Sequence, residues 1–212
     1  MRLKTPLIAG ALCVVSAVPA QACFLPYMAM YQAIPASPMF GAAVAFELGD
    51  YTYFSPTAYY AMRLGNSAVV TPGIGVCSGE GSTDPFFGSA LAFRLTSNEN
   101  MTLNLQTGLS YLPFDGGSEM TIPIGAAARF TSSGPMSFYA GATLLWQNFD
   151  VDGFESVSET DPLLFGGVSG TSGSIGWTLG GMLKMGDGTD FAIVGGINMN
   201  QASNAIRNFF RR

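Results

Sequence analysis

The sequence predicts an all-β fold, an antiparallel up-and-down transmembrane β-barrel of eight to ten strands. Segments of about ten residues alternate between apolar side chains and small or polar ones. Turn residues separate these segments, and only 11% of the 212 residues are charged, whereas soluble domains carry about 25%. A closed barrel in lipid accounts for all three observations, because it presents apolar side chains outward and small or polar ones inward.

The strongest alternation occupies residues 136–147, where every even position is apolar and most odd positions are small or polar. The same period of two occurs at 101–111 and 174–185. Weaker copies predict further strands at 39–48, 52–64, 67–77, 86–96, 120–131, 162–171 and 190–200. The sequence thus predicts ten strands, with eight as the alternative if 162–171 or an end strand does not form.

Turn chemistry separates the predicted strands, since glycine, asparagine, aspartate and serine favour tight connections. The predicted connections are Gly49-Asp50, Gly65-Asn66, 78–84, 97–100, Asp115-Gly116-Gly117, Ser133-Gly134-Pro135, Ser172-Gly173 and Asp187-Gly188. Between residues 147 and 162 the sequence predicts a longer loop, Phe149 to Asp161. No second domain or helical period is evident.

The N-terminus has the features of a secretory signal peptide. Arg2 and Lys4 precede an apolar stretch, and Ala20-Gln21-Ala22 fits the small-residue cleavage site. Prolines interrupt the uncharged stretch that follows, so no transmembrane helix is expected there. The expected organisation is a signal peptide at 1–22, a periplasmic or plug segment at 23–38, the barrel at 39–200 and a tail at 201–212.

The composition excludes several classes of function. The chain contains no histidine, so no catalytic triad, zinc site or proton relay can be built on an imidazole. No G-x-S-x-G motif occurs, and we therefore expect no catalysis, no cofactor and no metal site. Removal of Arg2 and Lys4 with the signal leaves seven basic residues against 14 acidic ones, a net charge of −7 that argues against nucleic-acid partners.

Two cysteines, Cys23 and Cys77, remain after the signal is removed. In an oxidising compartment they are able to form a disulfide, which would pin residues 23–38 in the lumen because Cys77 points inward by parity. A second interpretation has Cys23 acylated as the first residue of a lipoprotein, although Ala-Gln-Ala is a poor match to the usual preceding pattern. In the simplest interpretation both thiols only pack.

The acidic residues give an independent indication of topology. If the barrel begins on the periplasmic side, the connections after odd-numbered strands face outside. Of the 14 acidic residues, only Glu99 falls in a connection after an even-numbered strand. The other 13 lie in or beside the odd connections: Glu47, Asp50, Glu80, Asp84, Asp115, Glu119, Asp150, Asp152, Glu155, Glu159, Asp161, Asp187 and Asp190.

This architecture resembles the small bacterial outer-membrane β-barrels, the group that includes the opacity proteins and the transmembrane domain of outer-membrane protein A. The resemblance covers nearly all of residues 39–200 and rests on no diagnostic motif. It implies location in the bacterial outer membrane, in contact with outer-membrane lipid and lipopolysaccharide. The chain departs from the family at its end, where Phe209-Phe210 is followed by Arg211-Arg212 in place of a terminal aromatic residue.

Parity of the strands places several charges in the lumen. Arg63, Arg94 and Arg129 point inward near the periplasmic end, where they would form a basic ring that biases ion entry. A water-exposed rim that merely permits charge explains the same residues. Glu47 and Lys184 point inward near the external end, where they would be able to pair.

The predicted loop from Phe149 to Asp161 carries five acidic residues and no basic one. These are Asp150, Asp152, Glu155, Glu159 and Asp161. The sequence Asp150-Val151-Asp152-Gly153 matches a calcium-binding loop poorly, so a solvated external loop is expected. Divalent cations would still be able to bridge these acids to lipopolysaccharide phosphates.

Three functions fit the sequence. The first is a non-enzymatic outer-membrane barrel with acidic external loops and a structural or adhesive role in the cell envelope. The second is a narrow porin-like passive channel for ions or small solutes, favoured by small inward-facing residues. The third is a secreted soluble β-protein or fibre subunit, whose apolar strips would be buried against each other.

Overall fold

The computed structural model describes residues 30, 32–35, 37–48, 52–79, 82–132, 134–186 and 189–200. The predicted signal peptide, most of residues 23–31 and the tail at 201–212 lie outside these residues. Ten strands make up nearly all of the described chain. They are β1 (Met39–Leu48), β2 (Thr52–Leu64), β3 (Ala68–Gly79), β4 (Ser82–Ser97), β5 (Met101–Phe114), β6 (Gly117–Thr131), β7 (Met136–Val151), β8 (Val157–Ser172), β9 (Ile175–Met185) and β10 (Thr189–Asn200).

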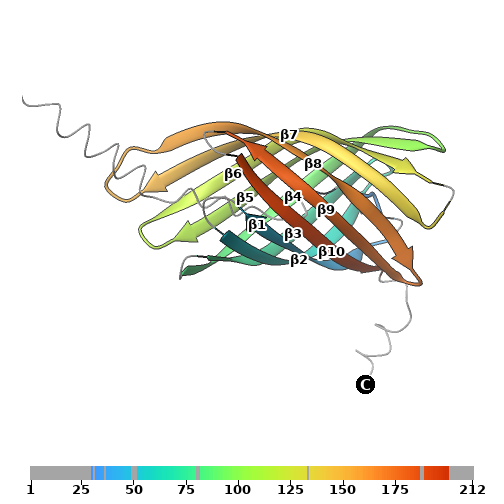
Figure 1. Ribbon diagram of the computed structural model, residues 1–212, viewed down its shortest axis with the longest axis horizontal. Helices are drawn as coiled ribbons and strands as arrows, with labels where there is room; N and C mark the ends of the chain where they lie inside the picture. The colour runs from blue at the N-terminus through green and yellow to red at the C-terminus, as the bar shows by residue number, and fades with distance from the viewer. Residues whose placement is uncertain are drawn as a thin grey trace, which may run out of the picture.

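The strands close into one barrel (Figure 1). Each strand pairs antiparallel with its neighbours in sequence, and β1 also pairs with β10 from Met39↔Asn200 to Leu48↔Phe191. Closure leaves no free sheet edge, as a bilayer requires of a β-structure. The predicted all-β up-and-down barrel is confirmed, with ten strands rather than eight.

The barrel has two ends that differ in their connections. We call the end that joins β1 to β2, β3 to β4, β5 to β6, β7 to β8 and β9 to β10 the loop end. The opposite end, where β1 begins and β10 finishes, is the turn end. At the loop end, the two-residue hairpin Asp115-Gly116 joins β5 to β6, and Gly116 adopts a φ of 81°, in the left-handed region that favours glycine.

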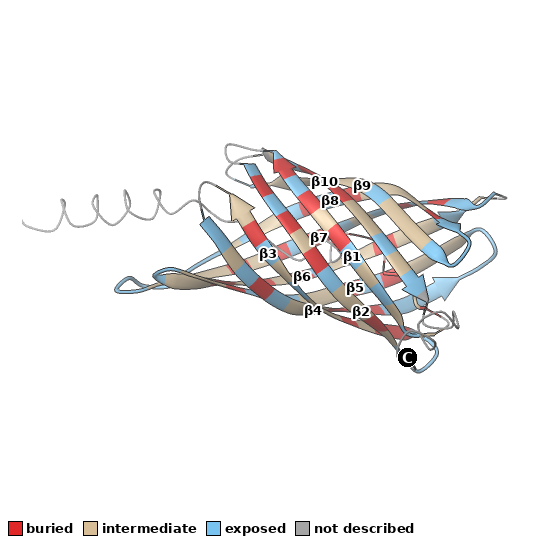
Figure 2. Cartoon of the chain, turned by 90° about the horizontal axis from the view of Figure 1, so that it is seen from below, coloured by how far each residue is buried: buried red, intermediate tan, exposed pale blue. Residues whose placement is uncertain are grey.

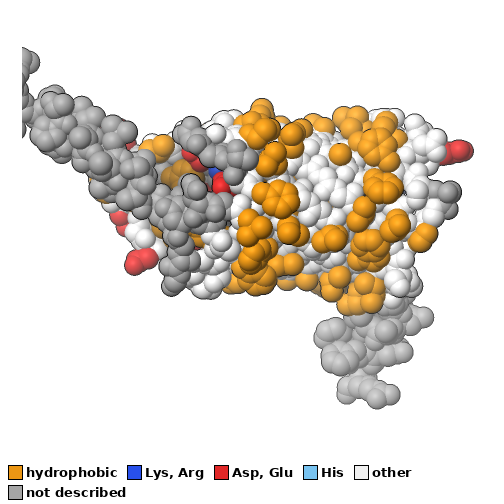
Figure 3. Space-filling model, in the orientation of Figure 1, with side chains coloured by type: hydrophobic (Ala, Val, Ile, Leu, Met, Phe, Trp, Pro, Cys, Tyr) orange, Lys and Arg blue, Asp and Glu red, His pale blue; other side chains and the backbone are white. Residues whose placement is uncertain are grey.

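The two faces of the wall are inverted relative to a soluble protein. Buried and exposed residues alternate along the strands in Figure 2. In β7, Phe138 and Leu144 are 53% and 56% exposed. The residues that follow each of them, Tyr139 and Leu145, are only 4% and 1% exposed. Apolar side chains therefore cover the outer wall in Figure 3, as the lipid-facing surface of a membrane barrel requires.

Aromatic side chains add cross-strand contacts to this outer surface. The rings of Phe40 and Tyr60 lie 4.6 Å apart, and those of Phe87 and Tyr111 lie 5.4 Å apart. Each pair joins adjacent strands, and such pairs contribute about 0.2–1 kcal/mol relative to alanine. A secreted soluble β-protein, the third function considered from the sequence, would have these apolar strips buried against each other, whereas here they are exposed.

Predicted strand boundaries are accurate to within one residue at the turn end, whereas those of β3 to β8 are too short at the loop end. The predicted long loop from Phe149 to Asp161 is wrong, because β7 continues to Val151 and β8 begins at Val157. Continued pairing as far as Phe149↔Val157 leaves only residues 152–156 as a connection. Polar and acidic residues concealed this strand pairing, since near the barrel rim both faces tolerate polar side chains.

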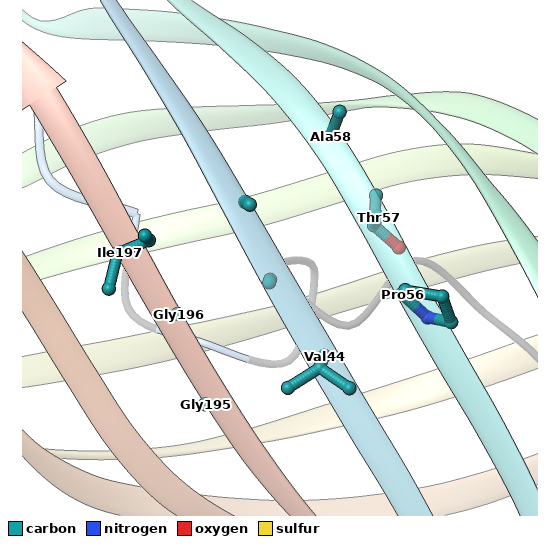
Figure 4. A pocket seen from close by; sticks show the side chains of 9 residues that line it. Val44, Pro56, Thr57, Ala58, Gly195, Gly196 and Ile197 are labelled. Carbon is teal, nitrogen blue, oxygen red and sulfur yellow. The ribbon is translucent and has the colours of Figure 1, made fainter.

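A shallow apolar groove crosses the outer wall where β10, β1 and β2 meet (Figure 4). It has a volume of about 510 Å³, and its lining includes Val44, Pro56, Ala58, Gly195 and Ile197. These residues offer no group for polar recognition, and the chemistry-bearing side chains face the lumen instead.

The outward position of Leu144 gives a test of the membrane assignment. We expect Leu144→Arg to destabilise the barrel in lipid vesicles by about 2–4 kcal/mol, because the guanidinium would enter hydrocarbon near the middle of β7. Leu95→Arg, near the turn end of β4, should cost about 0–1 kcal/mol. Urea unfolding in vesicles measures both, and equal, near-zero effects would contradict a lipid-facing outer wall.

Candidate functional site in the lumen

Large side chains fill much of the lumen. Phe86, Leu112, Leu145 and Leu163 come from four different strands and are each at most 2% exposed. They belong to one apolar cluster that also includes Tyr53, Phe165 and Met182. The interior of the barrel is therefore packed like the core of a soluble protein, and its inward face is not lined only by the small residues that the sequence suggested.

Acidic side chains gather inside the barrel toward the loop end. Lys184 Nζ lies 3.0 Å from Asp161 Oδ2 and 3.8 Å from Glu159 Oε1, so its ion pairs are made with β8. The suggested pairing of Lys184 with Glu47 is not among the ion pairs of the described residues. Both residues nevertheless line one small cavity together with Asp190.

Two buried carboxylates, Glu47 and Glu119, come from opposite walls of the barrel. Glu119 is 1% exposed, and one of its oxygens, Oε1, accepts hydrogen bonds of 2.8 Å from both Thr121 Oγ1 and Gln147 Nε2. Glu119 Oε2 and Glu47 Oε1 are buried and have no hydrogen-bond partner among the described residues. Glu119 was not predicted to be lumenal, because it lies just before the predicted strand at 120–131; the alternation of that strand, continued to residue 119, points it inward.

A short segment before β1 crosses the lumen. We call Met30 together with residues 32–35 the lumen strap. Gln32 N donates to Gln106 Oε1 at 3.0 Å, and Asn104 Nδ2 donates to the Gln32 carbonyl at 2.6 Å. Thr71 Oγ1 donates to Gln32 Oε1 at 3.3 Å, and Gln106 Nε2 donates to the Met30 carbonyl at 3.2 Å. These contacts fix the strap to β3 and β5.

The three predicted lumenal arginines lie at the turn end but differ in their partners. Arg63 is exposed and binds its own turn, with Nε 2.6 Å from the Gly65 carbonyl and Nη2 2.7 Å from Asn66 Oδ1. Arg94 is exposed. Arg129 is half-buried and Nη2 donates to Ser137 Oγ at 3.0 Å. They share one end of the barrel, and only Arg129 reaches into the interior.

The five acidic residues of the predicted external loop separate into two groups. Asp150, Asp152 and Glu155 are exposed at the loop end. Glu159 and Asp161 lie on the inward face of β8 and hold Lys184, because β8 begins before them. Their assignment to the external loop is corrected by this pairing.

Cys77 lies on the inward face of β3, is 2% exposed and is disulfide-bonded. The described residues include no other cysteine, and the two remaining cysteines of the chain, Cys13 and Cys23, lie outside them.

The described residues contain no group of three or more acidic or cysteine side chains arranged to hold a metal ion. Within the same part of the chain, no helix has the length and apolar character needed to cross a bilayer.

Similarity to known proteins is confined to the fold. No family model matches the chain, and no curated protein sequence matches it. An outer membrane channel from Pseudomonas putida F1 has a TM-score of 0.51 and 10% identity, covering 80% of this chain and 97% of its own. The translocator domain of the autotransporter NalP from Neisseria meningitidis has a TM-score of 0.50 and 10% identity, covering 91% and 97%.

The closed antiparallel barrel, the apolar outer wall and these structural matches define the class of the protein. It has the fold of the bacterial outer-membrane β-barrels. At 10% identity the matches establish the fold alone, and the role of the protein must be argued from its own lumen and loops.

We propose that the disulfide partner of Cys77 is Cys23, which is the first residue after the expected cleavage site. Peptide mapping of the envelope protein without reductant should find the two cysteines in one cross-linked species. Cys77→Ser should lower the free energy of unfolding by about 4 kcal/mol, since the bond closes a loop of roughly 50 residues. Two free thiols, or a lipid on Cys23, would contradict the pairing.

Proposed function

We propose that the protein is a closed, non-enzymatic outer-membrane barrel with a structural or adhesive role, which presents acidic side chains at its loop end. The observation that carries the proposal is the filled lumen, in which Phe86, Leu112, Leu145 and Leu163 are almost completely buried. The loop end is the external one in this proposal.

The strap supports closure of the lumen. Four hydrogen bonds join Met30 and Gln32 to Thr71, Asn104 and Gln106. Each such bond contributes about 0.5–1.5 kcal/mol, and removal of the strap would leave the buried amides of Asn104 and Gln106 unsatisfied. The Cys23–Cys77 disulfide would hold the same segment covalently.

The exposed acids at the loop end supply the outward-facing surface. Asp115, Asp150, Asp152 and Glu155 are all exposed there. The partner proposed for them is lipopolysaccharide, whose phosphates would be bridged to these carboxylates by divalent cations. Carboxylate oxygens are suitable ligands for calcium and magnesium, and each cation would retain water as further ligands.

The alternative, a narrow passive channel, rests on small inward residues. Gly167, Gly176, Gly180 and Gly196 are inward by the alternation of β8 to β10. The space next to them is partly occupied by the strap, since Met30 Cε lies 3.3 Å from where a Cβ of Gly196 would stand. This favours the closed barrel.

Conductance separates the two functions. We expect the intact, oxidised protein to show no stable conductance steps in planar bilayers, because buried side chains and the strap fill the path through the lumen. An open porin inserted under the same conditions serves as the positive control. Reproducible conductance steps would overturn the closed barrel and favour the channel, provided that the protein is folded. A change of mobility in an SDS gel after heating shows that it is.

The acidic surface is tested by binding to lipopolysaccharide vesicles with and without Mg²⁺. Magnesium should strengthen binding of the native protein several-fold and should have little effect on the triple variant Asp150→Asn, Asp152→Asn, Glu155→Gln. Glu99→Gln is the matched control, since it removes the acidic residue beside the opposite end of β5. Equal magnesium dependence in all three proteins would contradict the bridging role.

A further inference from the structure

A cavity of about 200 Å³ lies inside the barrel near the turn end. The lumen strap forms one side of it, and residues of β8, β9 and β10 form the other. Arg129 also lines it, from β6, which only β7 separates from β8. At about 30 Å³ per molecule in the liquid, this volume equals about seven waters, so the cavity suits a small solute.

The cavity exists because the inward side chains of β8 to β10 are small or polar in this half of the barrel. Ser169, Thr178 and Asn198 contribute hydroxyl and amide groups to the lining, and Tyr59 contributes its phenol from β2. Gly176 adds no side chain. The lining therefore provides several hydrogen-bond donors around an open space.

Arg129 is the charged residue of the lining. The described residues place no carboxylate within 4 Å of its guanidinium, and no Asp or Glu lines the cavity. Its Nη2 donates to Ser137 Oγ at 3.0 Å, and its side chain is half-buried. The guanidinium therefore lines an internal cavity without a counter-charge among the described residues, and burial of charge is costly unless it is paired.

We propose that this cavity binds a small oxyanion, a carboxylate or a phosphate, with Arg129 as its principal ligand. The planar guanidinium carries several N–H donors in a geometry that matches both groups. The hydroxyl groups of Ser169 and Thr178 line the same cavity and would donate to the remaining oxygens, whereas the Asn198 side chain is hydrogen-bonded to Tyr59.

The packing of the lumen determines how a solute reaches this site. Large apolar side chains such as Phe86 and Leu112 fill the lumen toward the loop end. The lining residues lie in the turn-end halves of their strands, which makes the turn end the route of entry. In the proposed orientation the anion therefore comes from the periplasm.

Calorimetric titration of the full chain in detergent tests the site. Sodium acetate and inorganic phosphate are titrated separately at constant ionic strength set with sodium chloride. We expect saturable binding of at least one of them. Acetate binding alone identifies a carboxylate ligand, and phosphate binding alone identifies a tetrahedral oxyanion. Absence of saturable binding for both overturns the proposal.

Variants tie the binding to the cavity. Arg129→Gln should weaken binding at least about tenfold through loss of the charge-assisted bonds. Arg63→Gln is the matched control at the same end and should bind like the native protein, since Arg63 donates to its own turn. Ser169→Leu, which keeps the charge and fills the space, should also weaken binding.

A difference in SDS-gel mobility between heated and unheated samples shows that each variant is folded. If Arg129→Gln does not fold, Arg129→Lys and Ser169→Leu decide the matter, and native affinity in both overturns the site. The result of the anion-binding experiment does not depend on whether the lumen is closed. Stable conductance would contradict the proposed function and leave the anion site in place, whereas absent anion binding would leave the closed barrel in place.

Discussion

The absence of water in the bilayer core is the constraint on which the rest of this structure depends. An unpaired backbone group there costs several kcal/mol, so the sheet must close on itself. The ladder between β1 and β10 achieves this closure. Once the sheet is closed, the pleat sends alternate side chains to lipid and to lumen, and this explains why Leu144 is exposed while Leu145 beside it is buried.

The inward face of the wall then carries the polar side chains. The same face also has to supply the side chains that pack the interior of the barrel. Apolar side chains such as Phe86 and Leu163 occupy part of it, while Gln32 and Asn104 meet there through hydrogen bonds. Charges are sorted along the barrel axis, with Lys184 held by Asp161 toward the loop end and Arg129 near the turn end. Each charge is kept away from hydrocarbon and close to one of the two aqueous mouths.

Most of the fold could be predicted from the sequence, because a period of two with short turns is a local signal. The bounds of β1 and β2 are those predicted, and parity placed Glu47 and Arg129 on the inward face. The rim could not be predicted in the same way, since both faces become polar where strands leave the membrane, and this concealed the start of β8. The partners of Lys184 and the contacts of Gln32 depend on register across the barrel, which no local pattern contains.

Filling the lumen limits where this barrel is able to act. A solute that entered from the turn end would meet the strap and, beyond it, side chains that are almost completely buried, so passage would require them to move together. Dense packing resists such a movement, because every displaced side chain loses its contacts at once. Recognition is therefore confined to the two ends. The loop end carries exposed carboxylates such as Asp152 and Glu155, and the turn end contains the cavity that the Arg129 guanidinium lines. Under the proposed function, the barrel would separate two aqueous sides, with an acidic surface on one and the proposed anion site on the other.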